Sequence, residues 1–263
     1  MQDVDELEVV LHEQKLAVIG QLASGVAHEI NTPMQYIGDN LGFVDDALAV
    51  LCDPEVAAST DPDELAFLRT ELPEAIRQAR RGVDRVNEIV KAMKAFGHRD
   101  EARQQYSDLD GLVRQALVVV RNETKYVADV HTALTLDRPV ACFPGDLGQV
   151  IVNLVVNAAH AIADHGPTCG ERGTISVRSW RDVDTAVIEI EDDGGGIPTD
   201  VRDRVFEPFF TTKEVGRGTG QGLPISRSVV EGRHGGTLAF RVLDGVGTIF
   251  RIELPVEGVG DVA

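Results

Sequence analysis

Two long stretches of the chain carry apolar residues at alternating steps of three and four, and this spacing constrains the fold more than any other feature. The first stretch runs from Leu16 to Leu51 and the second from Leu65 to Met93. Such steps keep the apolar side chains on one side of an α-helix, so each stretch predicts a long amphipathic helix. The segment between them, 52–63, is rich in Asp, Pro, Ser and Thr and predicts the turn of an antiparallel hairpin.

A single helical hairpin buries one apolar seam per helix and leaves much apolar surface in water. Two copies that form a four-helix bundle would cover this surface, and we therefore expect a homodimer. The seam ends in the polar sequence 97–105, which we interpret as a linker between domains. We place the helical-hairpin domain at residues 1–99 and a second domain at residues 106–263.

The periodicity changes after the linker, where helical and strand-like patterns are mixed. Helices are expected at 109–122, at 146–163 and from about Leu223, and strands are expected at 127–136, 174–181, 185–191, 237–243 and 247–254. The predicted fold class is therefore multidomain, with an all-α hairpin followed by a domain of layered helices and strands.

Composition limits the classes of function. The chain is 43% hydrophobic and 26% charged, as is typical of a globular protein. Its net charge is −18 and its longest basic run is Arg80-Arg81, so we expect no contact with nucleic acid. We recognise no membrane-spanning segment and no signal peptide, and expect a cytoplasmic protein. The three cysteines (Cys52, Cys142 and Cys169) lack paired metal-ligand spacing and are expected to be reduced.

His28 lies on the first long helix, two residues from a seam position on either side, and is expected to point away from the seam. A neutral imidazole in water is a nitrogen nucleophile that a phosphoryl donor can reach. Glu29 is placed to accept the ring proton or to hold the tautomer, and Thr32 to orient a water for the reverse, hydrolytic reaction. An ordinary exposed histidine beside a kink at Pro33 would explain the same spacing.

The sequence 28–33, HEINTP, resembles the phosphoacceptor box of dimeric sensor histidine kinases, as does the preceding sequence 20–27, GQLASGVA. The resemblance implies that His28 is phosphorylated, that Glu29 acts as the base and that Thr32 supports a phosphatase activity. Relatives often carry Asn at the position of Thr32.

A polar row lies on the otherwise apolar helix expected at 146–163. Gln149, Asn153 and Asn157 follow one another at steps of four, and His160 comes three residues later. Polar side chains are costly to bury without partners. Amide oxygens suit Mg²⁺, which usually binds together with the phosphates of a substrate. A solvated helix edge would give the same pattern.

Three further segments follow. The first, DDGGGIP at 192–198, comes after a strand, and its glycines would let the backbone approach a flat ring. A buried carboxylate at the strand end, Asp192, would accept a hydrogen bond from an adenine amino group. The second, VFEPFFTTK at 205–213, is aromatic. The third, GRGTGQGL at 216–223, precedes a helix whose backbone amides can contact phosphates. Each segment alone is also compatible with an ordinary loop.

Together and in this order, the four segments resemble the asparagine, first glycine, phenylalanine and second glycine boxes of the histidine-kinase ATP-binding domain. The resemblance covers roughly residues 15–255 and implies a Bergerat-type α/β sandwich that uses ATP and Mg²⁺. It makes Asn157 the magnesium ligand, Asn153 its companion and a catalytic residue, Asp192 the adenine contact and His160 a phosphate contact. The other residues that we assign to the nucleotide site are Gly194, Gly196, Ile197, Phe209, Thr212, Gly218, Thr219, Gly220, Gln221, Gly222 and Leu223.

The resemblance implies a protein-histidine kinase that autophosphorylates His28 and passes the phosphoryl group to an aspartate in the receiver domain of a response regulator. Phosphatase activity toward that regulator is the associated expectation. Two alternatives stay open at this point. Another ATPase or a serine/threonine-type protein kinase would explain the glycine loops but not the histidine box. A catalytically silent dimer would bind nucleotide only as a conformational switch.

Overall fold

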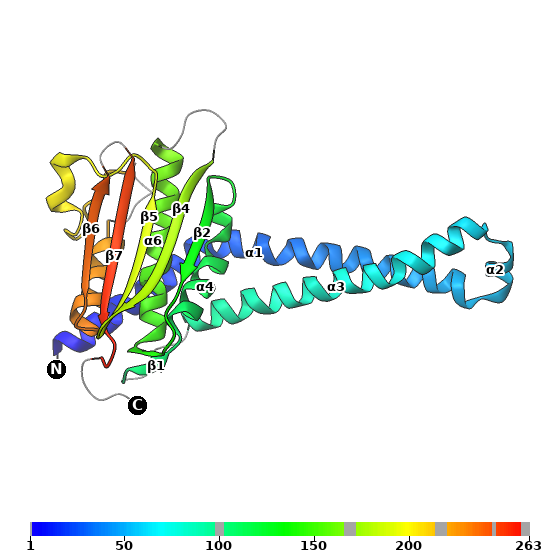
Figure 1. The fold of residues 1–263 in the computed structure, drawn as a ribbon, viewed down its shortest axis with the longest axis horizontal. Coiled ribbons are helices and arrows are strands. Elements are labelled where there is room, and N and C mark those ends of the chain that lie inside the picture. The colour runs from blue at the N-terminus through cyan, green and yellow to red at the C-terminus, as the bar shows by residue number, and fades with distance from the viewer. Residues whose placement is uncertain (1, 98–102, 166–171, 214–219, 244–245, 259–263) are drawn as a thin grey trace. The chain divides into compact units, whose positions relative to one another are not determined.

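The computed structural model describes residues 2–97, 103–165, 172–213, 220–243 and 246–258 (Figure 1). The chain divides into two compact units. One is the helical segment Ala23–Lys91, and the other contains the β-sheet.

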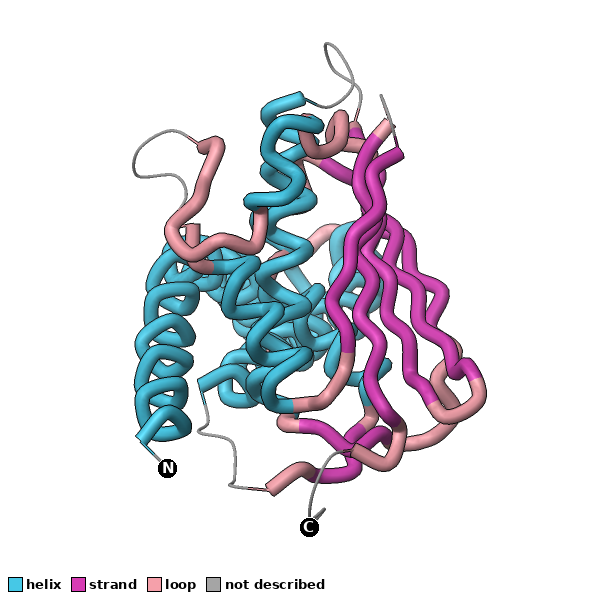
Figure 2. Tube along the Cα trace, turned by 90° about the vertical axis from the view of Figure 1, so that its left-hand side faces the viewer, coloured by secondary structure: helices cyan, strands magenta, loops and turns pink. Residues whose placement is uncertain are grey.

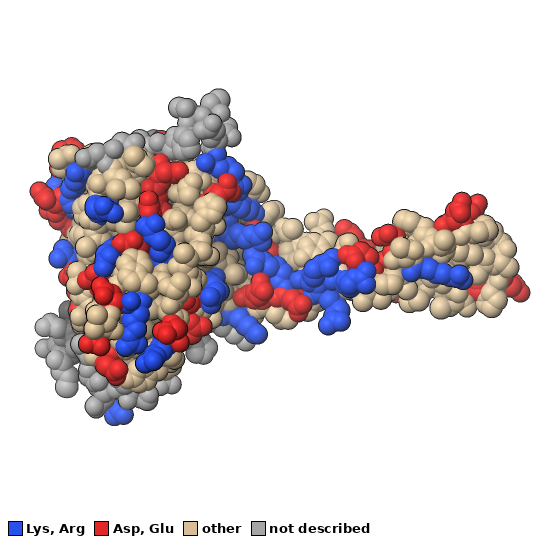
Figure 3. All heavy atoms as spheres, viewed as in Figure 1, with Lys and Arg blue, Asp and Glu red and all other residues tan. Residues whose placement is uncertain are grey.

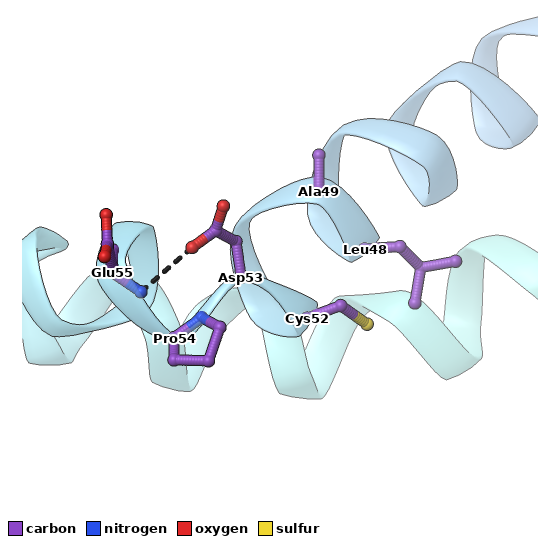
Figure 4. Close-up of a pocket in the computed structure, with 6 residues that line it drawn as sticks. All are labelled: Leu48, Ala49, Cys52, Asp53, Pro54 and Glu55. Carbon is purple, nitrogen blue, oxygen red and sulfur yellow. Dashed lines mark hydrogen bonds between the residues drawn. The ribbon is translucent and has the colours of Figure 1, made fainter.

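Two long helices, α1 (Gln2–Cys52) and α3 (Pro62–Gly97), form a hairpin, which confirms the prediction from apolar spacing, and their parts within Ala23–Lys91 make up the helical unit. Helix α1 continues through Pro33. The predicted turn contains a short helix that the sequence did not indicate, α2 (Pro54–Ser59). Asp53 caps this helix, because its side chain accepts hydrogen bonds from the backbone N–H groups of Glu55 (2.9 Å) and Val56 (3.3 Å). Figure 4 shows the hydrogen bond to Glu55.

Small side chains let α1 and α3 approach closely. Ala47 of α1 and Ala75 and Ala79 of α3 are buried. At Gly82 a Cβ atom would stand 2.6 Å from a side-chain carbon of Ile37, so glycine is required where the two helices meet. These positions form the seam between the helices of one chain.

A second set of seam residues is exposed. These side chains recur every seven residues along each helix and are between 39% and 52% exposed: Met34, Leu41 and Leu48 on α1, and Ile76, Val83 and Val90 on α3. A spacing of seven places each set in one row along its helix. One chain therefore buries only part of the predicted apolar seam.

The other unit is built on a mixed five-stranded sheet. Its strand order is β2-β4-β5-β7-β6, with β2 parallel to β4 and the other neighbours antiparallel. The strands are β2 (Ala128–Leu134), β4 (Gly173–Asp182), β5 (Thr185–Asp192), β6 (Thr237–Leu243) and β7 (Gly247–Pro255). A separate two-stranded sheet pairs β1 (Gln105–Ser107) with β3 (Val140–Cys142). The sequence did not predict β1 and β3, which are three residues each.

Helices cover one face of the five-stranded sheet (Figure 2). They are α4 (Leu109–Val119), α5 (Arg121–Thr124), α6 (Pro144–His165) and α7 (Gly222–Arg227), followed by a π-helical turn (Ser228–Arg233); a 3₁₀ helix spans Thr199–Arg204. Buried and partly exposed side chains alternate along β4, where Ile175 and Val177 are buried and Arg178 is half-exposed. The opposite face carries interspersed acidic and basic side chains (Figure 3). This arrangement confirms the expected α/β sandwich.

Helix α6 forms the core of this unit and contacts both β4 and β5. Ile151, Leu154 and Val155 on this helix are fully buried. Within the described residues, it is also the one helix that is long and apolar enough to cross a membrane, and 72% of its apolar window is buried in the unit. Its hydropathy is therefore that of a core helix.

The start of the α/β unit differs from the expected linker. Gln104 is buried, and its side-chain amide donates a hydrogen bond to the backbone oxygen of Arg233 (3.2 Å). Gln105 opens β1. Both residues were assigned to the linker, because their polarity gave no sign of burial; residues 98–102 lie outside the described part of the chain.

The hairpin turn between β4 and β5 yields a prediction about stability. Val183 is the first of two loop residues, lies 80% exposed and has a φ of 53°, a left-handed conformation that costs an L-residue roughly 1–2 kcal/mol. We expect Val183→Gly to raise the free energy of unfolding by about 1 kcal/mol in urea titrations. The neighbouring Asp184→Gly, where φ is not positive, should instead lower it by about 0.5–1 kcal/mol, and equal effects would contradict this explanation.

Candidate functional site

His28 is exposed on α1, as its position relative to the seam predicted. The hydroxyl of Thr32, one turn later, donates a hydrogen bond to the backbone oxygen of His28 (3.0 Å). A helical threonine commonly bonds in this way to the preceding turn. The hydroxyl oxygen still has lone pairs that can accept a hydrogen bond from water. The imidazole of His28 is thus accessible to a reactant from solvent, with Thr32 beside it.

Glu29 has a partner that the sequence did not reveal. Its side chain is only 12% exposed, and its Oε2 lies 3.8 Å from Nη2 of Arg85 on α3. Arg85 also donates from Nη1 to Oε2 of Glu88 (3.1 Å). The candidate base is therefore held opposite a guanidinium from the other helix of the hairpin. The register between the helices, which places Arg85 there, could not be read from the sequence.

The polar row of α6 faces other parts of the chain. Nδ2 of Asn153 donates to the hydroxyl of Ser226 on α7 (2.9 Å). Nζ of Lys213 donates to Oδ1 of Asn157 (3.3 Å) and lies 2.8 Å from Nδ1 of His160. Because an ammonium only donates, Nδ1 of His160 is the acceptor. The alternative interpretation of this row as a solvated helix edge is therefore wrong.

Lys213 belongs to this site, although it was not assigned from the sequence. It ends the aromatic segment, and its charge at that position was the available signal. Its ammonium group is a cation bound by the amide oxygen of Asn157, so the side chains of this row can hold a positive charge. In the described residues no three His, Cys, Asp or Glu side chains form a metal cluster. The donor set thus fits a cation that takes its remaining ligands from phosphates and water, as Mg²⁺ does.

Asp192 lies buried at the end of β5. Its Oδ1 accepts a hydrogen bond from the backbone N–H of Gly194 (2.9 Å), and its carboxylate also accepts one from the backbone of Thr248. Burial raises the pKa of Asp192 to about 6, although the two backbone hydrogen bonds act in the opposite direction. A carboxylate held this way is a fixed, desolvated acceptor for a ligand amino group.

Glycines bring two loops directly onto α6. At Gly194 a Cβ atom would stand 2.6 Å from the carbonyl carbon of Ala161, so the loop after β5 packs against the helix backbone. At Gly222 a Cβ atom would stand 2.4 Å from Oδ1 of Asn153. The loop after β5 and the start of α7 therefore both lie against α6, the helix that carries the polar row.

The aromatic segment has two roles in the structure. Phe206 packs toward the sheet, with its ring centroid 5.9 Å from that of Phe240. Phe209 is 71% exposed and has a positive φ of 64°. A Cβ atom at Gly220 would stand 2.4 Å from the backbone of Phe209, so the two segments are in contact. Packing onto the core explains Phe206 but not Phe209.

The other assigned residues lie on the same segments. The backbone oxygen of Ile197 accepts a hydrogen bond from Arg202 (2.9 Å), Gly196 has a φ of 84° and Thr212 is exposed. Gln221 and Leu223 are partly exposed at the start of α7. Gly218 and Thr219 lie outside the described residues. The assigned residues thus form two groups, one on the hairpin and one around α6.

An open groove lies at the turn of the hairpin (Figure 4). It is lined by Leu48, Ala49, Cys52, Asp53, Pro54 and Glu55. No residue assigned to a site from the sequence lines this groove, and the capping role of Asp53 accounts for its carboxylate.

Comparison with known proteins identifies the unit built around α6. Residues 144–258 match the family described as histidine kinase-, DNA gyrase B-, and HSP90-like ATPase. The catalytic domain of the histidine kinase ThkA is similar in structure, with 29% identity and a TM-score of 0.51 over 59% of this chain and 96% of that one. Full-length ShkA, solved in complex with AMPPNP, shares the fold at 19% identity and a TM-score of 0.50, over 92% of this chain and 47% of that one. These matches confirm the predicted ATPase-type domain.

Curated relatives match across both units. The chain is 31% identical to the sensor kinase CckA of Brucella abortus over 92% of its own length and 25% of that protein. It is 30% identical to the signal transduction histidine-protein kinase AtoS of Escherichia coli, over 94% of this chain and 36% of AtoS. It is also 30% identical to the sensor histidine kinase ZraS of Salmonella typhimurium, over 95% of this chain and 48% of ZraS. The chain thus spans between a quarter and a half of these relatives.

The raised pKa of Asp192 predicts a dependence of stability on pH. The folded state binds this proton more tightly than the unfolded state, so Asp192 adds to stability as the pH falls through 6. Between pH 7.5 and pH 5, the free energy of unfolding of the wild type should rise by about 1 kcal/mol relative to Asp192→Asn in urea titrations. Asp200→Asn, at an exposed carboxylate, is the control and should show no such difference; a pH-independent difference for Asp192→Asn would contradict the assignment.

Proposed function

We propose, on the premise that the chain belongs to the sensor histidine kinases, that it transfers the γ-phosphoryl group of ATP to His28. The observation that carries this proposal is an exposed histidine, followed by a carboxylate, on a helical hairpin in the same chain as an ATPase-type unit. A histidine with an accessible ring nitrogen is the nucleophile that such a transfer requires.

Asp192 is the proposed contact for the adenine ring. Its carboxylate can accept a hydrogen bond from the amino group of adenine, whereas the oxygen that guanine carries at that position would be repelled. Two backbone N–H groups hold the carboxylate in place, so little reorganisation is needed when the base binds. This arrangement supports ATP as the substrate.

The polar row of α6 is the proposed contact for the phosphates. Asn157 would hold Mg²⁺ through Oδ1, the atom that binds the ammonium of Lys213, and Asn153 lies beside it, tied to α7. Bound Mg²⁺ supplies positive charge that stabilises the transferring phosphoryl group. Lys213 and His160 can then donate hydrogen bonds to phosphate oxygens, and His160 does so through a nitrogen that carries a proton.

Transfer to His28 breaks the bond between the γ-phosphorus and its bridging oxygen and forms a phosphorus–nitrogen bond. The electron pair of the broken bond leaves with ADP. The imidazole attacks with its unprotonated nitrogen and then gives the proton of its other nitrogen to a base, for which Glu29 is the candidate. The product is a phosphoramidate on an exposed helix face.

We also propose the acceptor that follows. A phosphoramidate can pass its phosphoryl group to a carboxylate, and the receiver domain of a response regulator offers such an aspartate. Thr32, whose hydroxyl retains accepting capacity, is the candidate for orienting a water in the phosphatase reaction on that regulator. Because ATP is the donor, we propose a cytoplasmic location for this part of the protein.

A homodimer is the proposed assembly. The two exposed rows on α1 and α3 have the spacing of coiled-coil positions. Two hairpins that pack these rows against each other would form a four-helix bundle and remove six large apolar side chains per chain from water. The hydrophobic gain from this burial supports a stable pair.

Labelled ATP tests the transfer to His28. Incubation with γ-labelled ATP and Mg²⁺ should give a phosphoprotein that survives base and is lost in acid, because phosphoramidates hydrolyse in acid. His28→Ala should reduce the label to background, whereas His131→Ala, at an exposed histidine on β2, should leave it unchanged.

The same assay separates the alternatives. An acid-stable label, or a label that survives His28→Ala, would favour a serine/threonine-type kinase. Binding of ATP without any label would favour a silent nucleotide switch. Either result would overturn the proposed function.

Charges in the exposed rows test the dimer. Leu41→Glu combined with Val83→Glu would bury uncompensated charges between the hairpins, which costs several kcal/mol. We expect sedimentation equilibrium to show a dimer for the wild type. For the double variant, the dissociation constant of the dimer should be at least about 100-fold higher. Gln35→Glu combined with Asn87→Glu adds the same charge at exposed polar positions and should remain dimeric; a monomeric wild type would contradict the proposal.

A further inference from the structure

Arg85 is a largely buried cation in the hairpin to which the proposed chemistry gives no role. Its side chain is 23% exposed. Two of its nitrogens, Nε and Nη2, are buried without a hydrogen-bond partner, while Nη1 donates to Glu88. A buried guanidinium without its full set of hydrogen bonds is unfavourable, so its presence needs another explanation than stability.

Other arginines of α3 show what an ordinary surface pair looks like. Arg77 and Arg81 both bind Glu74 on their own helix, and both are about 60% exposed. Such exposed pairs contribute little to stability. Arg85 differs, because its guanidinium reaches across to α1 and meets Glu29, the residue next to His28.

The distance between these two groups is informative. At 3.8 Å, Nη2 of Arg85 attracts Oε2 of Glu29 without forming a hydrogen bond to it. Arg85 therefore restrains the carboxylate by charge and does not itself occupy one of its lone pairs. A carboxylate that must accept a proton from a neighbouring ring needs such a lone pair.

We propose that Arg85 is a positioning residue that orients Glu29 toward His28 for autophosphorylation. This inference rests on the proposed function. When the ring of His28 becomes positively charged during transfer, Glu29 takes the proton from the nitrogen that is not phosphorylated. The protonated Glu29 is attracted less by Arg85 and gives the proton to water, which restores the ion pair. Arg85 itself neither gains nor loses a proton.

The test is a double-mutant cycle on the full chain. The rate of acid-labile labelling at saturating ATP is measured for the wild type, Arg85→Met, Glu29→Gln and the double variant. Arg85→Met should lower the rate about tenfold, part of the effect expected for a general base, because Glu29 is then poorly oriented. In the Glu29→Gln background the same substitution should change the rate less than about twofold, since Arg85 acts through Glu29.

Two further variants separate orientation from folding. Arg85→Lys keeps the charge and should restore the rate to within about threefold of the wild type. Arg81→Met removes an exposed arginine one helical turn away and should leave the rate unchanged. The affinity for a fluorescent ATP analogue and the dimer mass should be the same in all variants. If Arg85→Met does not fold, Arg85→Gln, which retains N–H donors without charge, takes its place.

The outcomes distinguish this inference from the proposed function. If the wild type acquires no label on His28, the proposed function is wrong, and the inference, which rests on it, is wrong as well. If the wild type is labelled but Arg85→Met reacts at the same rate, the inference alone is overturned. The inference would also be overturned if Arg85→Met slowed labelling equally in the wild type and in Glu29→Gln, because Arg85 would then not act through Glu29.

Discussion

Burial of α6 against the sheet is the constraint on which the rest of the ATPase-type unit depends. The helix is apolar on the side that contacts β4 and β5, so its polar row must emerge on the other side. Amide groups so close to the core need partners, and segments far along the chain supply them: Ser226 bonds Asn153, and Lys213 bonds Asn157. The same hydrogen bonds that satisfy the row therefore place the residues assigned to the nucleotide site around it.

The hairpin differs from this unit, because a single chain leaves part of the apolar surface of the hairpin exposed to water. Small residues such as Ala79 and Gly82 let α1 and α3 pack closely, and the larger apolar residues remain in two exposed rows. The sequence spacing places His28 on a different face of α1 from the exposed row of that helix. A contact between two chains that covers the rows would thus stabilise the proposed bundle and leave His28 accessible.

Sequence periodicity predicted the long helices and the main strands, because their apolar spacing is a local property. It missed β1 and β3, which are too short for a period, and α2, which depends on a cap at Asp53 within a polar turn. Asn153, Asn157 and Asp192 could be proposed from local motifs. Lys213 and Arg85 could not be paired with Asn157 and Glu29 in the same way, since these contacts depend on how distant segments pack.

Both missed residues are cations that lie next to residues with a proposed chemical role. Lys213 stands at the oxygen of Asn157, and Arg85 stands near the carboxylate of Glu29. In a chain with a net charge of −18, an anionic nucleotide would meet general repulsion unless positive charge were concentrated where the phosphates bind. The fold supplies positive charge locally, by bringing single basic side chains from distant segments to the two places where the proposed function requires phosphate to be held or accepted.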